Sequence, residues 1–219
     1  SVDLDGTARI AAHLVANGSD GVVVSGTTGE APTTTVPEDG EILAAVKDAV
    51  GGDAVVIAGV GTNSTAHSVE LAEQAAKVGV DGILLVTPYY NKPGQAGTLH
   101  HFRSVVEATE LPVMLYDVPG RTATIIELPT YEAMSSYDHV LAVKDATGQL
   151  DRSARVAQMG YSIYSGDDEA TLGYLAYGAV GLVSVVAHAA GNQLAAMIDA
   201  YLAGDRDEAL RLHLSLLPA

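Results

Sequence analysis

The chain has 219 residues, 48% of them hydrophobic, and a formal net charge of −16 at pH 7. This charge argues against nucleic acid and anionic membranes as partners, because both repel an acidic surface. The chain contains no cysteine, which excludes disulfides and thiolate metal sites, and no apolar run long enough to span a bilayer, so we expect one cytoplasmic domain covering residues 1–219.

Short apolar runs alternate with amphipathic segments along the whole chain, which predicts repeated βα units. We expect strands at 22–24, 55–58, 83–86, 112–116, 141–144, 161–164 and 182–186. We expect helices at 7–17, 37–50, 65–78, 99–108, 127–134, 150–159, 169–177, 192–203 and 206–217. The strands begin roughly 20 to 33 residues apart, which is the span of one βα unit.

Two α/β architectures accommodate this alternation, an open doubly wound sheet and a (β/α)8 TIM barrel. An open sheet concentrates its site near one switch point, whereas a barrel gathers the loops after many strands at one face. Polar clusters follow nearly every predicted strand here, at 26–30, 61–63, 87–90, 116–121, 144 and 165–168. We therefore predict a TIM barrel.

One strand of an eight-stranded barrel is missing from this count. The chain begins Ser1-Val2-Asp3-Leu4 and enters a helix at once, and it stops at Pro218-Ala219 just after a helix. We therefore expect an internal fragment of a longer protein. Because an incomplete barrel exposes unpaired strand edges, we expect the isolated chain to aggregate, or to remain molten and inactive.

Lys144 ends the apolar run Val140-Leu141-Ala142-Val143, so its amine is expected at the C-terminal end of a buried strand. Poor solvation lowers the pKa of such an amine, and a neutral lysine can form a Schiff base with a ketone. Tyr116 ends the preceding strand and should face the same mouth, where a phenol can shuttle protons. The alternatives are a surface lysine and a half-buried structural tyrosine.

Two further loops carry groups suited to carboxylates. In Gly26-Thr27-Thr28-Gly29-Glu30, glycines let backbone amides face a ligand and two hydroxyls add donors. Its alternative is a tight loop beside helix-capping threonines at 33–35. Arg121 lies beside a glycine on the loop after Tyr116 and suits bidentate carboxylate binding, its alternative being a solvated surface charge.

Other motifs point away from cofactors and metals. The segment 59–64 resembles half of a dinucleotide fingerprint, but Ser64 replaces the last glycine, so a glycine-rich turn is the better interpretation. His100 and His101 are adjacent in a helix and cannot face one ion together, and Asp167-Asp168 has no evident third ligand. We therefore predict neither a bound cofactor nor a metal.

These clusters, in this order, resemble the dihydrodipicolinate synthase family, part of a superfamily of pyruvate-dependent class I aldolases and N-acetylneuraminate lyases. The matching segments span the chain: 26–30, 86–93, 115–122, 143–148 and 165–168. The resemblance implies a (β/α)8 barrel lacking its first strand and C-terminal helical region. It also implies condensation of pyruvate, bound as an imine, with aspartate semialdehyde in lysine and diaminopimelate biosynthesis, by a dimer or tetramer when complete.

The resemblance also assigns roles to residues. Lys144 corresponds to the Schiff-base lysine, and Tyr116, Thr27 and Tyr90 to a proton relay in which Tyr90 acts across a subunit interface. The substrate-binding positions correspond to Thr28 for the pyruvate carboxylate, Arg121 for the second substrate's carboxylate, and Gly166 and Val183 along the pyruvate pocket.

Alternatives within and beyond the family remain at this point. Sister enzymes such as N-acetylneuraminate lyase and keto-sugar-acid lyases share the lysine and tyrosine, whereas Thr27-Thr28 and Arg121 favour the synthase. A non-catalytic keto-acid-binding relative is disfavoured because Lys144 and Tyr116 are both present.

Many members of the family also carry a lysine feedback site. Asn63 and Tyr89 match it, but weak inhibition is expected from the departures at Ala31, Val36, Asp39 and His67.

Overall fold

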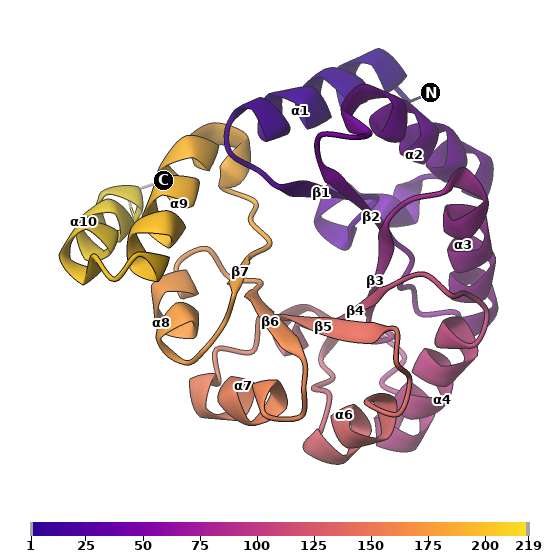
Figure 1. Cartoon of the computed structure of the whole chain (residues 1–219). Coiled ribbons are helices and arrows are strands. Elements are labelled where there is room, and N and C mark those ends of the chain that lie inside the picture. Colours follow the sequence, from indigo (N-terminus) through magenta and orange to yellow (C-terminus); the bar gives the residue numbers. More distant parts are fainter. Residues whose placement is uncertain (1, 218–219) are drawn as a thin grey trace.

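The computed structural model describes residues 2–217. The prediction of an internal fragment drew partly on Ser1, Pro218 and Ala219, which lie outside the described residues. Seven parallel strands form one sheet in the order of the sequence, and helices surround it (Figure 1). The strands are β1 (Gly21–Val24), β2 (Val55–Gly59), β3 (Gly82–Val86), β4 (Val113–Asp117), β5 (Val140–Asp145), β6 (Ser162–Ser165) and β7 (Gly181–Leu182). The predicted incomplete barrel is therefore confirmed as an open barrel of seven strands.

Helix α1 precedes β1, the other helices alternate with or follow the strands, and together they surround the sheet (Figure 1). They are α1 (Leu4–Ala16), α2 (Val36–Val50), α3 (Thr65–Val78), α4 (Gly94–Val106), α5 (Pro119–Thr122), α6 (Leu128–Met134), α7 (Leu150–Ala157), α8 (Thr171–Ala176), α9 (Ala187–Leu202) and α10 (Arg206–Leu216). Two short 3-10 turns, Thr27–Gly29 and Ala31–Thr33, lie between β1 and α2. None of the helices within residues 2–217 is long and apolar enough to cross a bilayer.

The ring of helices closes where the ring of strands does not. Within the described residues, β1 pairs only with β2 and β7 only with β6. Across that opening α9 packs on α1, where the Asn192 amide donates a hydrogen bond to the Asn17 side chain at 2.8 Å. Gly191 makes this approach possible, because a Cβ there would lie 2.5 Å from the Asn17 carbonyl oxygen.

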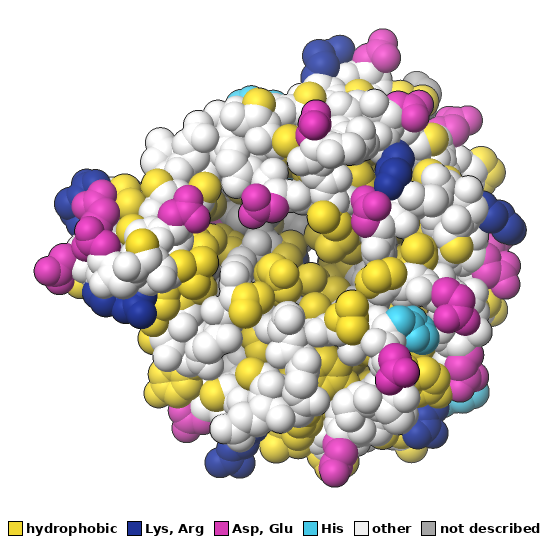
Figure 2. Space-filling view, in the orientation of Figure 1, with side chains coloured by type: hydrophobic (Ala, Val, Ile, Leu, Met, Phe, Trp, Pro, Cys, Tyr) yellow, Lys and Arg dark blue, Asp and Glu magenta, His cyan; other side chains and the backbone are white. Residues whose placement is uncertain are grey.

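Alternation along the strands divides the apolar side chains into two layers. The larger cluster fills the space between the sheet and the helices and includes Leu85, Leu115 and Val143. The smaller cluster lies inside the barrel and includes Val86, Tyr116 and Ala142. In the view of Figure 2, hydrophobic side chains line the central hollow, while acidic side chains are scattered over the outer helices.

Local signals explain where the helices begin. Thr35 caps α2 through a capping box, in which its hydroxyl accepts the Glu38 N–H while the Glu38 carboxylate accepts the Thr35 N–H. Ser64 caps α3, and its strand-to-helix turn is a packing feature, because a Cβ at Gly61 would lie 2.3 Å from the Val86 backbone nitrogen. This agrees with the interpretation of segment 59–64 as a glycine-rich turn.

Several predicted boundaries were wrong. Helix α4 begins at Gly94 instead of residue 99, because its first turn lacks the apolar periodicity that marks the rest. Helix α9 begins at Ala187 instead of residue 192, with a kink at Ala190 that separates the predicted part from an extra turn. The strand predicted at 182–186 is only Gly181–Leu182, because the Asp168 carboxylate accepts the backbone N–H groups of Val185 and Val186 and turns the chain towards α9.

Candidate active site

Lys144 and Tyr116 lie side by side inside the barrel at the C-terminal ends of β5 and β4. The two residues pair in register across these strands, so both side chains point to the same face of the sheet. The Lys144 amine nitrogen is 4.3 Å from the centre of the Tyr116 ring, and the two residues are only 8% and 7% exposed. The predicted neighbourhood of amine and phenol is therefore present in the structure.

Burial favours the neutral form of the Lys144 amine. Desolvation lowers its pKa from 10.5 to about 8, although the nearby Asp168 carboxylate opposes this shift. An amine with this pKa is about half neutral near pH 8 and keeps a neutral fraction of about one tenth at pH 7, and the neutral form is the one that can attack a carbonyl carbon. The surface-lysine alternative is thus excluded by the burial of the side chain.

The Tyr116 phenol stays protonated, so it can donate a proton or a hydrogen bond. Burial raises its pKa above 10.0, and the Arg121 guanidinium partly opposes the increase. Arg121 lies on α5, which begins two residues after the end of β4, and its backbone N–H bonds to the Val118 carbonyl at 2.9 Å. Strand β4 and the turn after it therefore carry a proton donor and a cation to one site.

A cavity of about 940 Å³ opens beside this pair. Six predicted site residues line it: Thr27, Thr28, Tyr116, Arg121, Lys144 and Gly166. They come from loops and strands distributed along the first three quarters of the chain, as the barrel hypothesis required. Side chains that the sequence interpretation did not assign to the site also line it, among them Val118, Ala146, Asp168, Val186 and His213.

Two predicted site residues lie elsewhere. Tyr90 is 88% exposed, with a left-handed backbone (φ 69°), and lines a second cavity of about 490 Å³ together with Thr27 and Arg121. Val183 does not line the main cavity; it packs on the inner apolar cluster, and its N–H bonds to the Ser165 carbonyl at 2.8 Å. Within this chain, then, neither residue reaches the Lys144 cavity.

Buried or half-buried carboxylates hold two of the loops that form the cavity. Asp39, 5% exposed on the first turn of α2, accepts hydrogen bonds from Ser25 at 3.2 Å and Thr34 at 2.7 Å, on either side of Thr27 and Thr28. Asp168 accepts the hydroxyl of Ser184 and the backbone N–H groups that follow β7. The sequence interpretation considered Asp168 only as a cation ligand, although its place after β6 indicated a role near Lys144.

Of the two adjacent histidines at 100 and 101, His101 has a buried ring that contacts the protein. His101 is buried against Thr65, whose hydroxyl lies 2.9 Å from the ring Nδ1, and burial lowers the pKa of this histidine to about 4. Within residues 2–217, no three His, Asp or Glu side chains are grouped as ligands of one metal ion would be. The contact with Thr65 and the burial of the ring fit a structural role for His101.

Comparison with known proteins gives consistent matches over the whole chain. The family model described as the dihydrodipicolinate synthetase family matches residues 1–219. The chain is 57% identical to the 4-hydroxy-tetrahydrodipicolinate synthase of Acidothermus cellulolyticus over 219 residues, which are 100% of this chain and 71% of that protein.

Two solved structures are similar in both sequence and fold. The dihydrodipicolinate synthase of Cyanidioschyzon merolae with lysine bound has a TM-score of 0.94 at 42% identity, covering 98% of this chain and 74% of that one. The chloride-inhibited enzyme of Acinetobacter baumannii complexed with pyruvate has a TM-score of 0.92 at 34% identity, covering 97% of this chain and 74% of that one.

The first prediction concerns the space around the lysine. A Cβ at Gly166 would lie 3.0 Å from Lys144 Cγ and 3.1 Å from Cε, so Gly166→Ala should displace the amine by a few tenths of an ångström. We expect kcat/KM for the keto acid to fall roughly tenfold, because small displacements of reacting groups cost large factors in rate. Steady-state kinetics of the complete gene product provide the measurement.

The matched control is Gly173→Ala on α8, where the added methyl meets only Leu150, at 3.2 Å. This variant should keep kcat/KM within twofold of the wild-type value. Equal kinetics for the two variants would contradict the role of Gly166 in making room for Lys144.

Proposed function

The chain belongs to the dihydrodipicolinate synthetase family, and on this basis we propose how its residues condense pyruvate with L-aspartate 4-semialdehyde. The activity is that of a 4-hydroxy-tetrahydrodipicolinate synthase, a lyase of lysine and diaminopimelate biosynthesis. The observation that carries the assignment of residues is the buried Lys144 amine beside the Tyr116 ring in a cavity open to substrate.

In the proposed mechanism, the neutral Lys144 amine attacks the ketone carbon of pyruvate. A C–N bond forms, the carbinolamine loses water, and an imine results. Loss of a methyl proton converts the imine to an enamine, whose carbon attacks the aldehyde of the second substrate and forms the new C–C bond. The amine of that substrate then displaces Lys144, which closes the product ring and frees the enzyme.

Tyr116 is proposed to move the protons that these steps require, since its phenol is protonated and adjacent to the amine. Thr27 lines the same cavity, and its hydroxyl is proposed to exchange a proton with the Tyr116 phenol. Tyr90 is proposed to complete the relay in the site of a neighbouring subunit, which its 88% exposure allows. The active form is accordingly a homo-oligomer, a dimer or a tetramer.

The carboxylates of the two substrates are assigned to different donors. Thr28 and the backbone amides of its 3-10 turn are proposed to bind the pyruvate carboxylate, and Arg121 to bind that of the semialdehyde. Gly166 leaves room for the imine, and Val183 is proposed to support the pocket from behind, through the inner apolar cluster that contains Tyr116. The covalent imine on Lys144 supplies the chemistry, so no cofactor is proposed. We also propose that the enzyme is cytoplasmic and that residues 1–219 form one domain.

Trapping the imine tests this assignment directly. Borohydride added with pyruvate should reduce the imine to a stable secondary amine on Lys144, detected by mass spectrometry of peptides from the complete gene product. Lys144→Arg should abolish the modification, because a guanidinium does not form the imine, whereas Lys77→Arg on the exposed face of α3 should not affect it. Modification of Lys47, Lys77 or Lys92 with Lys144 untouched would rule out the mechanism.

We also propose that lysine inhibits this enzyme weakly or not at all. Ala31 and Val36 offer no polar side-chain contact, and the Asp39 carboxylate is already bonded to two hydroxyls of the 25–34 loop. The expected result is less than half inhibition at millimolar lysine in an activity assay. An inhibition constant below the millimolar range would contradict the interpretation of these substitutions.

A further inference from the structure

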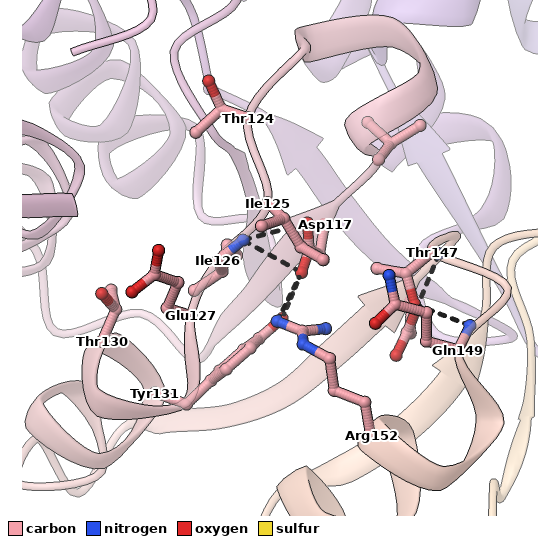
Figure 3. Close-up of polar contacts among 12 residues, drawn as sticks. Asp117, Thr124, Ile125, Ile126, Glu127, Thr130, Tyr131, Thr147, Gln149 and Arg152 are labelled. Carbon is pink, nitrogen blue, oxygen red and sulfur yellow. Dashed lines mark hydrogen bonds and ion pairs between the residues drawn. The ribbon is translucent and has the colours of Figure 1, made fainter. Parts of the chain in front are cut away.

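A buried ion pair lies directly behind the catalytic tyrosine, on the outer face of the sheet. Asp117 follows Tyr116 as the last residue of β4, so its side chain points away from the cavity towards the helices, and it is 0% exposed. Its carboxylate oxygen Oδ2 is 3.2 Å from Arg152 of α7 and accepts the Tyr131 hydroxyl of α6 at 3.2 Å (Figure 3).

Asp117 is the carboxylate partner of a guanidinium that is itself largely buried. The Arg152 side chain is 13% exposed, and its guanidinium carbon lies 5.5 Å from the centre of the Tyr131 ring. Within residues 2–217, its two terminal nitrogens have no hydrogen-bond partner, so the ion pair with Asp117 is their main polar contact. Burial, together with Asp145 on the neighbouring strand, raises the pKa of Asp117 to about 6, against the opposing effect of Arg152. Arg152 is the largest of the groups that favour the charged carboxylate, and the Ile126 N–H and the Tyr131 hydroxyl act in the same direction.

The same carboxylate also closes the loop that carries Arg121. Both of its oxygens lie 3.2 Å from the backbone nitrogen of Ile126, so residue 117 bonds directly to residue 126 (Figure 3). The intervening segment contains α5 and Arg121. On its other side, Gln95 of α4 donates to the Ile125 carbonyl at 2.7 Å and accepts the Glu127 N–H at 3.0 Å. The base of the loop is thus held between α4 and β4.

We propose that Asp117 and Arg152 are positioning residues for the condensation: their ion pair fixes the end of β4 and the base of the 118–125 loop, and so sets where the Tyr116 phenol and the Arg121 guanidinium stand relative to Lys144. This proposal rests on the roles assigned to Tyr116 and Arg121 above. Damage to the pair should slow the proton-transfer steps and weaken binding of the semialdehyde, but it should leave the binding of pyruvate and the final amount of its imine on Lys144, which belongs to β5, unchanged.

Physical arguments favour a positioning role over simple stabilisation. The desolvation of two charges offsets most of their attraction, so a buried ion pair contributes little net stability compared with a neutral packed alternative. Removing one partner, however, leaves the other charge buried and uncompensated, which strongly disfavours the packing around it. That packing is made by β4, α6, α7 and the Arg121 loop.

The test uses single and double variants of the complete gene product. Asp117→Asn keeps the shape but removes the charge, and should lower kcat about tenfold to a hundredfold and raise KM for the semialdehyde several-fold. KM for pyruvate and the extent of borohydride trapping at saturating pyruvate should stay within twofold of wild type. Arg152→Lys, which keeps the charge, should retain kcat within about threefold. Asp117→Asn with Arg152→Gln, which removes both charges, should recover much of the lost kcat.

The matched control is Asp81→Asn, which removes another ion pair far from the site. Asp81 lies at the opposite end of the sheet, where its carboxylate accepts the Val56 N–H at 2.8 Å and pairs with Lys47 at 3.0 Å. This variant should lower the melting temperature without changing kcat or either KM. If Asp117→Asn behaves in the same way, or raises KM for pyruvate as much as KM for the semialdehyde, the positioning role is wrong.

Tyr116→Phe, measured in parallel, separates this proposal from the proposed function. Loss of the phenol should reduce kcat roughly a hundredfold or more while pyruvate still binds. Near-normal turnover of Tyr116→Phe would refute the proton relay itself, whereas a slow Tyr116→Phe beside an unaffected Asp117→Asn would refute only the role of the ion pair.

Discussion

The contact between the Lys144 amine and the Tyr116 ring is the constraint on which the rest of the site depends. An amine 4.3 Å from a ring centre and 8% exposed loses much of the water that would stabilise its charge. The register of β4 against β5 brings the two side chains to the same level. The missing side chain of Gly166 leaves the space through which the lysine extends. The lowered pKa of Lys144 follows from burial, and strand pairing brings the amine to its place beside Tyr116.

Three aspartate carboxylates hold loops around this centre, so part of the chain's acidic content has a structural role near the site. Asp39 holds the loop of Thr27 and Thr28, Asp117 holds the loop of Arg121, and Asp168 holds the segment between β7 and α9. Each accepts backbone N–H or hydroxyl groups of the loop that it holds. Such groups keep the positions of loop residues defined in a site whose substrates are themselves anions.

The sequence carried enough information to predict the strands, the barrel and the pair at its centre. Apolar runs ending in Tyr116 and in Lys144 could be recognised because a buried parallel strand is short and apolar and its C-terminal end faces the site. The length of β7 could not be predicted from the sequence. The valine-rich run at 183–186 is typical of a strand, but the Asp168 carboxylate, from another loop, binds the backbone that follows Leu182 and ends the strand there. The partnership of Asp117 with Arg152 was missed for the same reason, since it joins two elements whose packing no local pattern encodes.

The central claim is that burial beside Tyr116, in the folded protein, makes the Lys144 amine a nucleophile. Its most direct test is an NMR titration of the lysine side chains in the complete gene product labelled with ¹³C and ¹⁵N, with the Lys144 signal assigned by its absence in Lys144→Arg. The account predicts a pKa of about 8 for this amine. Titration at or above 10.5 would contradict it, because the amine would then be as well solvated as an exposed lysine.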